Sequence, residues 1–423
     1  MIEREKRLLL GMLAALGVLL RVTDLGVPDF ATDEAQAALA ASAAWTPLGM
    51  GILKNVTMLF GQHILVARSV SALFGIACLP LIYLLTREMT KKTDIALLAT
   101  VIAALFPTHI LFSRLAYLSI QECFWWLVVL YTFLKAKKEK EMFWYLLLFT
   151  ATVASTMTKT QDILLPAFLV IGRIIELRMK VLRDTLSWIL IIACIPFGFF
   201  FLTHPGISAT LFLYGGNMYG VSGPFARIID LATVWWKLLG IYLIAMAASL
   251  PALRTFPWPF HALLLVAVLT GYLLGPGHEY YATHLVFFSI PIATALLRSD
   301  ASLRIAAMGL CTAYTLLTLG PTSLFLNPWT NHLYQKTGFW NQNAAAINDL
   351  LKEEEAVTVL GDAGHHFRWY LAPRVLVGRD MIAPYQTQYL ILTILAEAPK
   401  AKGGTVILSS EELALVKLEV QDE

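Results

Sequence analysis

Long apolar runs recur along this chain and constrain its fold more than any other feature. Most of them approach the length of a helix that crosses the roughly 30 Å hydrocarbon core of a bilayer. The chain is 58% hydrophobic and 14% charged, whereas soluble domains carry about 25% charged residues. We therefore predict an α-helical polytopic membrane protein with about eleven spans, near residues 7–22, 64–86, 94–112, 116–134, 143–158, 163–177, 185–203, 231–250, 258–275, 283–297 and 305–321.

Basic residues give these predicted spans an orientation. Lysine and arginine gather in the N-terminal tail, in "REMTKKTD", "KAKKEKE", "GRIIELRMKVLRD" and "RSDASLR", and at Arg254. The short connections on the other side carry fewer, namely Lys54, Arg114, Lys159 and Arg227. Because positive residues favour the cytoplasmic side, we predict a multi-pass plasma-membrane protein with a cytoplasmic N-terminus. An odd number of spans places the C-terminus outside. The N-terminal segment "MIEREKRLLLGMLAALGVLL" is predicted to be an uncleaved first helix.

The composition changes after residue 321. The stretch "NQNAAAINDLLKEEE" is typical of an amphipathic helix, and "HHFRWYLA" favours another short helix. The runs "AVTVLG" and "GTVILSS" are β-rich and bounded by glycine. We predict that residues 322–423 form a small extracytoplasmic α/β domain, after a transmembrane module of residues 1–321.

Two further features exclude classes of protein. The four cysteines all fall inside apolar runs, which argues against a disulfide framework or a metal knuckle. The net charge of +3 is too small to indicate a nucleic-acid partner. The expected surroundings are membrane lipids.

Polar residues next to the spans gather at the predicted outer ends. Ionisable groups inside a membrane are expensive and are usually paired or functional. Their gathering on one face predicts a polar cavity that opens outward. The residues are Asp33, Glu34, Arg68, His109, Arg114, Gln121, Glu122, Lys159, Asp162, Arg227, Asp230, His278, Glu279, Tyr280, Tyr281 and His284.

Several of these residues also have an ordinary structural interpretation, whereas Arg68, inside its span, is harder to explain in that way. Asp33 is as well suited to capping a helix as to chemistry. Arg114 fits a headgroup anchor at the end of a span. Glu122 lies deeper in its span, where a structural pair with a neighbouring helix and a functional role are equally favoured. His278 fits an ordinary loop histidine.

Several motifs, taken in order, carry a resemblance to a known family. They are "TDEAQAALAA", "ARSVSALFGIACLPLIYLLTREM", "FPTHILFSRLAYLSIQECFWWLVVLYTFL" and the lysine of "TMTKTQDILLPAFLV". Together they resemble the GT-C glycosyltransferases that use lipid-linked sugars, in particular the protein mannosyltransferase and aminoarabinose transferase type. The resemblance spans roughly residues 7–300. In "GHEYYATHLVFFSIP", Glu279 stands where the family pattern would have an arginine.

The resemblance implies a reaction and its participants. An acceptor on a protein, lipid or glycan attacks the anomeric carbon of a polyprenyl-phosphate sugar with inversion, and polyprenyl phosphate leaves. Asp33 is the candidate base, because an acceptor hydroxyl needs one at the attack point, and Glu34 is the candidate orienting residue. No cofactor is required, although a divalent cation between Asp33 and the phosphate is compatible with these residues. The candidate phosphate-binding residues are Arg68, Arg114, Lys159 and Arg227, and the candidate substrate-binding residues are Glu122, His278, Glu279 and Tyr281.

Other classes of membrane protein remain open from the sequence. A secondary transporter or flippase for a polar or glycolipid substrate is the main alternative, and Glu122 is the residue that fits it best. A transporter of that kind predicts central charges and an internal repeat, and no convincing repeat is found between the halves. A non-catalytic scaffold and a polymerase of lipid-linked glycans are the further alternatives.

Overall fold

A computed structural model of the protein describes residues 2–23, 25, 47–61, 63–203, 239–274 and 279–319. It also describes short stretches at 228–229, 232–233, 235–236, 346–347 and 349–350. In the C-terminal region it describes five strands, within residues 357–418.

The first half of the described chain is a succession of apolar helices. Helix α4 ends where Lys91 takes a left-handed conformation, and α7 ends in the same way at Lys140. A cation just past a helix C-terminus is favoured by the helix dipole. The elements are α1 (Ile2–Val22), α3 (Pro47–Phe60), α4 (Ile64–Thr90), α5 (Thr93–Ala104), α6 (Pro107–Ser113), α7 (Leu118–Glu139), α8 (Met142–Thr158), η1 (Thr160–Ile163), α9 (Leu164–Leu177) and η2 (Arg178–Arg183).

The second half continues in the same way and adds two more 3-10 helices. It comprises α10 (Thr185–Ala193), α11 (Ile195–Thr203), α14 (Ile241–Ser249), η3 (Leu250–Thr255), α15 (Trp258–Leu274), η4 (Glu279–Phe288), α16 (Ser289–Leu297) and α17 (Ala301–Leu319). Each of the eleven predicted apolar runs therefore contains helix.

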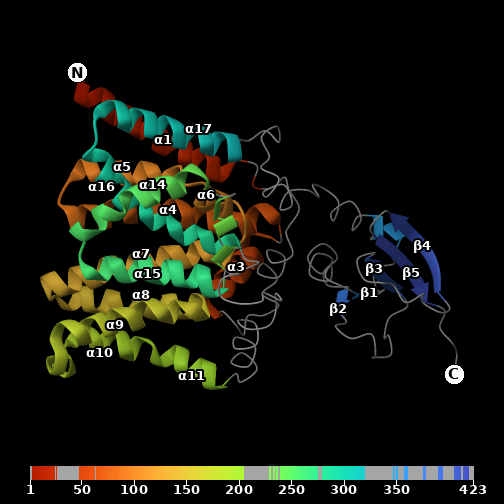
Figure 1. Ribbon diagram of the computed structural model, residues 1–423. Coiled ribbons are helices and arrows are strands. Elements are labelled where there is room, and N and C mark those ends of the chain that lie inside the picture. Colours follow the sequence, from red (N-terminus) through yellow and green to blue (C-terminus); the bar gives the residue numbers. More distant parts are fainter. Residues whose placement is uncertain are drawn as a thin grey trace.

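The long helices pack side by side as one bundle (Figure 1). Helix α4 packs against α5 and α7, α7 against α8, and α16 against α5, while α15 packs against α9. The connections α4–α5, α7–α8 and α9–α10 all lie at the end of the bundle where the N-terminus lies (Figure 1). The basic segments predicted to be cytoplasmic thus share one end, as that prediction requires.

One predicted span is broken rather than continuous. The run 94–112 forms α5 and α6, which are bent by 58° at a break before Pro107. Proline disfavours helical backbone in the residue before it, and Phe106 is extended accordingly. The run 185–203 forms α10 and α11, which join at Cys194, where the backbone stays helical. The sharp bend of 97° lies before Thr185, between this run and the preceding helical segment.

One helix of the structure was not expected. Helix α3 carries Lys54, which the sequence analysis placed in a short outer connection. Its 14 residues reach only about 21 Å at 1.5 Å per residue, so the run is too short to read as a span. It packs against α4 and α8.

By length and apolar composition, two helices within the described residues are able to cross a membrane, Ile64–Thr90 and Ala301–Thr318. The number is four if each of two bent pairs is one span. Many large apolar side chains face outward from the bundle, for example Leu73, which is 67% exposed, and Phe199, which is 70% exposed. A lipid environment accommodates such a surface. The span count of eleven and the orientation stay predictions.

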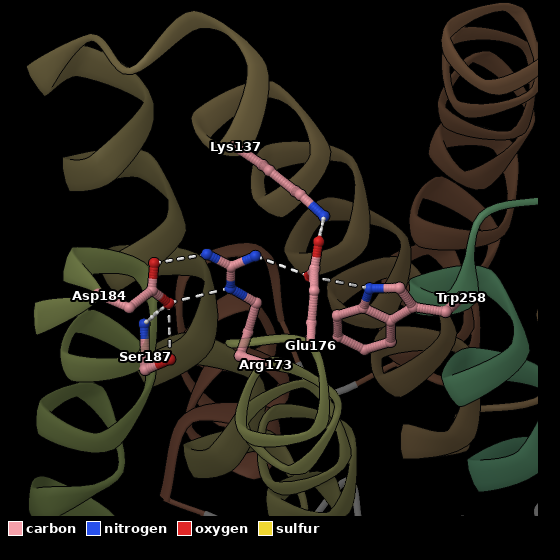
Figure 2. Close-up of polar contacts among 6 residues, drawn as sticks. All are labelled: Lys137, Arg173, Glu176, Asp184, Ser187 and Trp258. Carbon is pink, nitrogen blue, oxygen red and sulfur yellow. Dashed lines mark hydrogen bonds and ion pairs between the residues drawn. The ribbon is translucent and has the colours of Figure 1, made fainter. Parts of the chain in front are cut away.

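Ion pairs join the helices at the N-terminal end of the bundle. Arg173 of α9 donates to Asp184, the N-cap of α10, at 2.9 Å from Nε and 2.5 Å from Nη2. Glu176 accepts from Lys137 at 2.8 Å and from Arg173 at 2.7 Å, so α7, α9 and α10 are linked. The residues of this network are drawn in Figure 2: Lys137, Arg173, Glu176, Asp184, Ser187 and Trp258.

The C-terminal region contains one five-stranded mixed sheet in the order β2-β1-β3-β5-β4. Strand β1 pairs in parallel with β2 and β3, while β5 pairs antiparallel with β3 and β4. The strands are β1 (Val357–Leu360), β2 (Val375–Val377), β3 (Tyr389–Thr393), β4 (Gly404–Ser410) and β5 (Leu413–Leu418). Both β-rich runs from the sequence analysis form strands here. The helical part of the predicted α/β domain lies largely outside the described residues, so the α/β assignment stays a prediction.

Candidate functional site

The predicted site residues divide into those that the structure describes and those that it does not. Asp33, Glu34, Arg227 and His278 lie outside the described residues. Glu279 and Tyr281 lie in η4, of which the structure describes the backbone at these positions. Their side-chain roles therefore stay predictions. The four with described side chains are Arg68, Arg114, Glu122 and Lys159.

Glu122 and Lys159 are brought together by the fold. Glu122 lies on α7 and is fully buried. Its Oε2 lies 3.3 Å from Lys159 Nζ and 3.2 Å from His284 Nε2. The lysine side chain is 12% exposed. A buried carboxylate between a cation and an imidazole is stabilised, whereas the same carboxylate alone would carry a large desolvation penalty.

A second buried carboxyl group completes this cluster. Asp162 lies on η1, is fully buried, and accepts a hydrogen bond at 2.9 Å from Trp126 Nε1. Trp126 stacks on His284 with 4.5 Å between ring centroids. We call Glu122, Trp126, Lys159, Asp162 and His284 the carboxyl cluster.

The local sequence explains how the carboxyl cluster forms. Glu122 and Trp126 are four residues apart, which places them on one face of α7. Helix α8 ends at Thr158, and Lys159 takes an extended conformation before η1 begins. That turn brings both Lys159 and Asp162 against α7. His284 is supplied by η4, which contacts α7 and α15.

Arg68 and Arg114 occupy other positions at the same end of the helices. Arg68 on α4 is fully buried and donates from Nη1 to the carbonyl of Leu25 at 3.1 Å. Arg114 is the C-cap residue of α6 and is 8% exposed. The helix dipole favours a cation at that position. Glu122 and Lys159 are therefore in contact with each other, while Arg68 lies on α4 and Arg114 lies at the end of α6.

A buried arginine that the sequence analysis did not select holds the break between α5 and α6. Arg21 on α1 is fully buried and donates to the carbonyls of Gly17, Ala103 and Ala104 at 2.6, 3.1 and 2.6 Å. Its Nη2 also lies 2.8 Å from His109 Nδ1. Because a guanidinium always donates, Nδ1 must accept, and the histidine proton resides on Nε2.

A signal for Arg21 was present in the sequence. It is a lone arginine at the outer end of the first apolar run, where the positive-inside rule disfavours it. Asp162 and His284 were among the outer polar residues but were not selected as site residues. Trp126 gave no such signal, because tryptophan in an apolar run is ordinary.

The carboxyl cluster brings charged, hydrogen-bond-accepting and aromatic groups together. Lys159 supplies a cation, Glu122 and Asp162 supply acceptors, and Trp126 and His284 supply a flat aromatic surface. Among the residues that the structure describes, no group of three His, Cys, Asp or Glu side chains could hold a metal ion. The predicted use of a divalent cation rests on Asp33 and stays untested.

Known proteins show the same fold over nearly the whole chain. The structure of ArnT from Cupriavidus metallidurans bound to undecaprenyl phosphate matches with a TM-score of 0.68 at 13% identity, covering 97% of this chain and 98% of that one. Its apo form matches with a TM-score of 0.69 at 14% identity and covers 98% of each. The oligosaccharyltransferase AglB from Archaeoglobus fulgidus, in complex with an inhibitory peptide and a dolichol-phosphate, matches with a TM-score of 0.59 at 12% identity, over 99% and 75% of the two chains.

Sequence comparison adds a match over part of the chain. Residues 44–202 match the family model described as dolichyl-phosphate-mannose-protein mannosyltransferase. A comparison with curated protein sequences finds no match. The matched segment includes Arg68, Arg114, Glu122, Lys159 and Asp162. The resemblance to the GT-C glycosyltransferases that the motifs predict is therefore confirmed, and the chain has the fold of that superfamily.

Proposed function

We propose that this protein is an inverting glycosyltransferase. It moves a sugar from a polyprenyl-phosphate donor to a protein, lipid or glycan acceptor at the outer face of the plasma membrane. The observation that carries the proposal is the fold shared with ArnT over 97% of this chain and 98% of that one, in a structure that holds undecaprenyl phosphate. The AglB structure, which holds a dolichol-phosphate, supports the same donor class.

The proposed roles follow from the charges that develop on the sugar and on the departing phosphate during transfer. Asp33 takes the proton of the acceptor and stabilises positive charge on the sugar, as carboxylates do in oxocarbenium-like transition states. Glu34 orients the acceptor. Negative charge develops on the departing phosphate, and the cations proposed to stabilise it are Arg68, Arg114, Lys159 and Arg227.

The position of Lys159 supports its proposed role. Its ammonium lies 3.3 Å from Glu122, and 12% of the lysine side chain is exposed, so the side chain is oriented and is not fully buried. A lysine that is already oriented loses less conformational freedom when its ligand binds. Glu122 is thereby proposed to act on the donor through Lys159. Contacts of His278, Glu279 and Tyr281 with the substrate remain part of the proposal.

The proposed division of the chain follows from this reaction. Residues 1–321 form the transmembrane catalytic module, with the N-terminus in the cytoplasm. Residues 322–423, which include the five-stranded sheet, form the extracytoplasmic domain. The sugar-bearing lipid phosphate and the acceptor then meet on the same side of the membrane as that domain.

The experiment combines purified protein with radiolabelled polyprenyl-phosphate hexoses and pentoses and a membrane extract that supplies acceptors. We expect label to move from one donor to an acceptor, and Asp33→Asn to lower the rate by at least about 100-fold, as removal of a general base does. Asp29→Asn, in the same segment, is the matched control and should retain activity. Equal transfer by the wild type and Asp33→Asn would overturn the base assignment.

A transporter or flippase is the alternative function, and a separate assay distinguishes it. Counterflow of a labelled substrate into vesicles, with its structure unchanged, would support transport. The described structure gives that alternative less support than the sequence did. Glu122, the residue that fitted it best, is paired with Lys159 at the end of α8 rather than lying alone in a span.

A further inference from the structure

The turn between α9 and α10 carries three cations that no acid of the described structure neutralises. The 3-10 helix η2 (Arg178–Arg183) forms this turn, and none of its six residues is buried. Arg178, Lys180 and Arg183 supply the charge. Among the residues that the structure describes, none of these three side chains takes part in an ion pair. The turn therefore presents a concentrated positive charge to its surroundings.

The acids on either side of η2 are already occupied. Glu176 accepts from Lys137 at 2.8 and 3.0 Å and from Arg173 at 2.7 Å. Asp184 accepts from Arg173 at 2.9 and 2.5 Å and from the backbone N–H of Ser187 at 3.1 Å. Figure 2 shows both carboxylates directed at these internal donors. Their negative charge is balanced inside the bundle, so the positive charge of η2 is available to an external partner.

Large apolar side chains accompany the cations. Met179 is 79% exposed and Leu182 is 62% exposed. Trp188 of α10 is also exposed, and its Nε1 donates to the carbonyl of Leu182 at 2.9 Å. Tryptophan and cations beside apolar side chains are typical of segments that lie in the interface between lipid headgroups and acyl chains. We call the following residues the basic turn: Arg178, Met179, Lys180, Leu182, Arg183 and Trp188.

The fold places the basic turn at the edge of an outward-facing apolar surface. Helix α9 exposes Ile171 and Ile175, and helix α10 exposes Ile191 and Ile192. The chain bends by 97° between these helices. The bend lies at the end of the bundle where the N-terminus lies (Figure 1). Because acyl chains cover the apolar surface of such helices, the turn that joins them lies at the level of the headgroups.

We propose that the basic turn binds anionic phospholipid headgroups in the leaflet at the N-terminal end of the bundle. The guanidinium groups of Arg178 and Arg183 suit bidentate contact with a phosphate, and Lys180 adds a point charge. Met179 and Leu182 enter the acyl region beside the same lipid. A soluble acidic partner would leave these two side chains in water, so the apolar pair favours a lipid. This surface lies at the opposite end of α9 from the carboxyl cluster.

Native mass spectrometry of the purified full chain measures the binding. The protein in neutral detergent is titrated with phosphatidylglycerol, with phosphatidylcholine and with soluble polyglutamate. We expect phosphatidylglycerol to bind at least about tenfold more tightly than either of the others, because basic residues near a membrane surface attract anionic lipids. Equal binding of the two lipids, or polyglutamate that binds as tightly as phosphatidylglycerol, would overturn the proposal. No sugar donor is present, so failure here is separate from failure of the proposed function.

A variant without the three charges locates the binding surface. Arg178→Gln/Lys180→Gln/Arg183→Gln is expected to weaken phosphatidylglycerol binding at least about tenfold and to leave phosphatidylcholine binding unchanged. All three positions are exposed, so the variant should fold, and thermal unfolding in neutral detergent checks this. Unchanged affinity for phosphatidylglycerol would show that the basic turn is not the binding surface.

The matched control removes three cations at the same end of the bundle. Lys91, Lys135 and Lys138 each pair with Glu88, at 2.5, 3.5 and 3.0 Å. We expect Lys91→Gln/Lys135→Gln/Lys138→Gln to keep an affinity for phosphatidylglycerol within about threefold of the wild type, because these charges are already balanced. A loss equal to that of the basic-turn variant would mean that overall charge, rather than the basic turn, attracts the lipid.

Discussion

At the residue scale, Arg21 shows how one side chain stabilises a break between helices. Its guanidinium satisfies the carbonyls of Ala103 and Ala104 at the end of α5, and it fixes the ring of His109. Arg21→Met leaves these buried acceptors without a donor, which costs about 1–3 kcal/mol for each group. We expect the free energy of unfolding to fall by roughly 2–4 kcal/mol, measured as thermal unfolding in detergent.

The control for this residue is Lys180→Met, on the exposed surface of η2. It removes a basic side chain of similar length without removing a buried donor. Its melting temperature should stay close to that of the wild type. Equal melting temperatures for Arg21→Met and Lys180→Met would show that Arg21 does not stabilise the break.

The sequence predicted part of the site at this scale. An acid inside an apolar run marked Glu122, and a lysine in a short connection marked Lys159, because each is expensive in a membrane. Their pairing was not predictable, because it depends on how α7 packs against the turn after α8. Asp162 and Trp126 required the same tertiary information.

At the element scale, the close approach of α4 to α6 depends on Gly75. A Cβ at this position would overlap the side chain of Ser113. Gly75→Ala is therefore expected to lower the free energy of unfolding by about 1–3 kcal/mol, and Ser113→Gly in the same chain should recover part of the loss. Gly11→Ala is the matched control, since a Cβ there meets nothing within 4 Å. Independent, additive effects of the Gly75 and Ser113 changes would contradict the contact.

The start of α10 gives a prediction about pH. Burial would raise the pKa of Asp184, but the hydrogen bonds from Arg173 and Ser187 outweigh it and hold the pKa below its ordinary value. A lowered pKa in the folded state stabilises the protein above the ordinary carboxyl range. That stabilisation is lost as the pH falls through the lowered value. Asp184→Asn should therefore lower the melting temperature at neutral pH, and the difference should close in acid.

Asparagine retains one oxygen for the cap but replaces the oxygen that accepts from Arg173 Nη2, so the substitution removes the charge together with that hydrogen bond. We expect Asp184→Asn to lower the free energy of unfolding by about 1 kcal/mol at neutral pH. Thermal unfolding of both proteins across the pH range measures this difference. Asp94→Asn, at an exposed position in the first turn of α5, is the control. If the difference in melting temperature between the wild type and Asp184→Asn became larger in acid, the ionised Asp184 would not be stabilising the folded state, and the prediction would be wrong.

The sequence predicted where helices lie better than it predicted where they are interrupted. Apolar runs located helical segments because burial in lipid or protein requires internally satisfied backbone. The bend of 58° before Pro107 was missed because the run 94–112 is apolar on both sides of it. Helix α3 was missed because a 14-residue run is shorter than a span.

At the scale of the whole molecule, two polar networks lie at opposite ends of the same helices. The carboxyl cluster lies where α8 ends and α9 begins, and the network of Arg173 and Glu176 lies near the end of α9. About 14 residues of helix, or roughly 20 Å, separate these ends. The network near the N-terminal end joins helices to one another, while the carboxyl cluster is where we place donor binding.

The central claim concerns the whole molecule, and one measurement tests it most directly. Purified protein in liposomes is given a labelled polyprenyl-phosphate sugar and an acceptor extract, and the free polyprenyl phosphate formed is counted against the sugar transferred. The proposed transfer predicts one polyprenyl phosphate for each sugar on the acceptor, with both products lost in Asp33→Asn. Labelled donor that crosses the bilayer intact, with no polyprenyl phosphate formed, would contradict it.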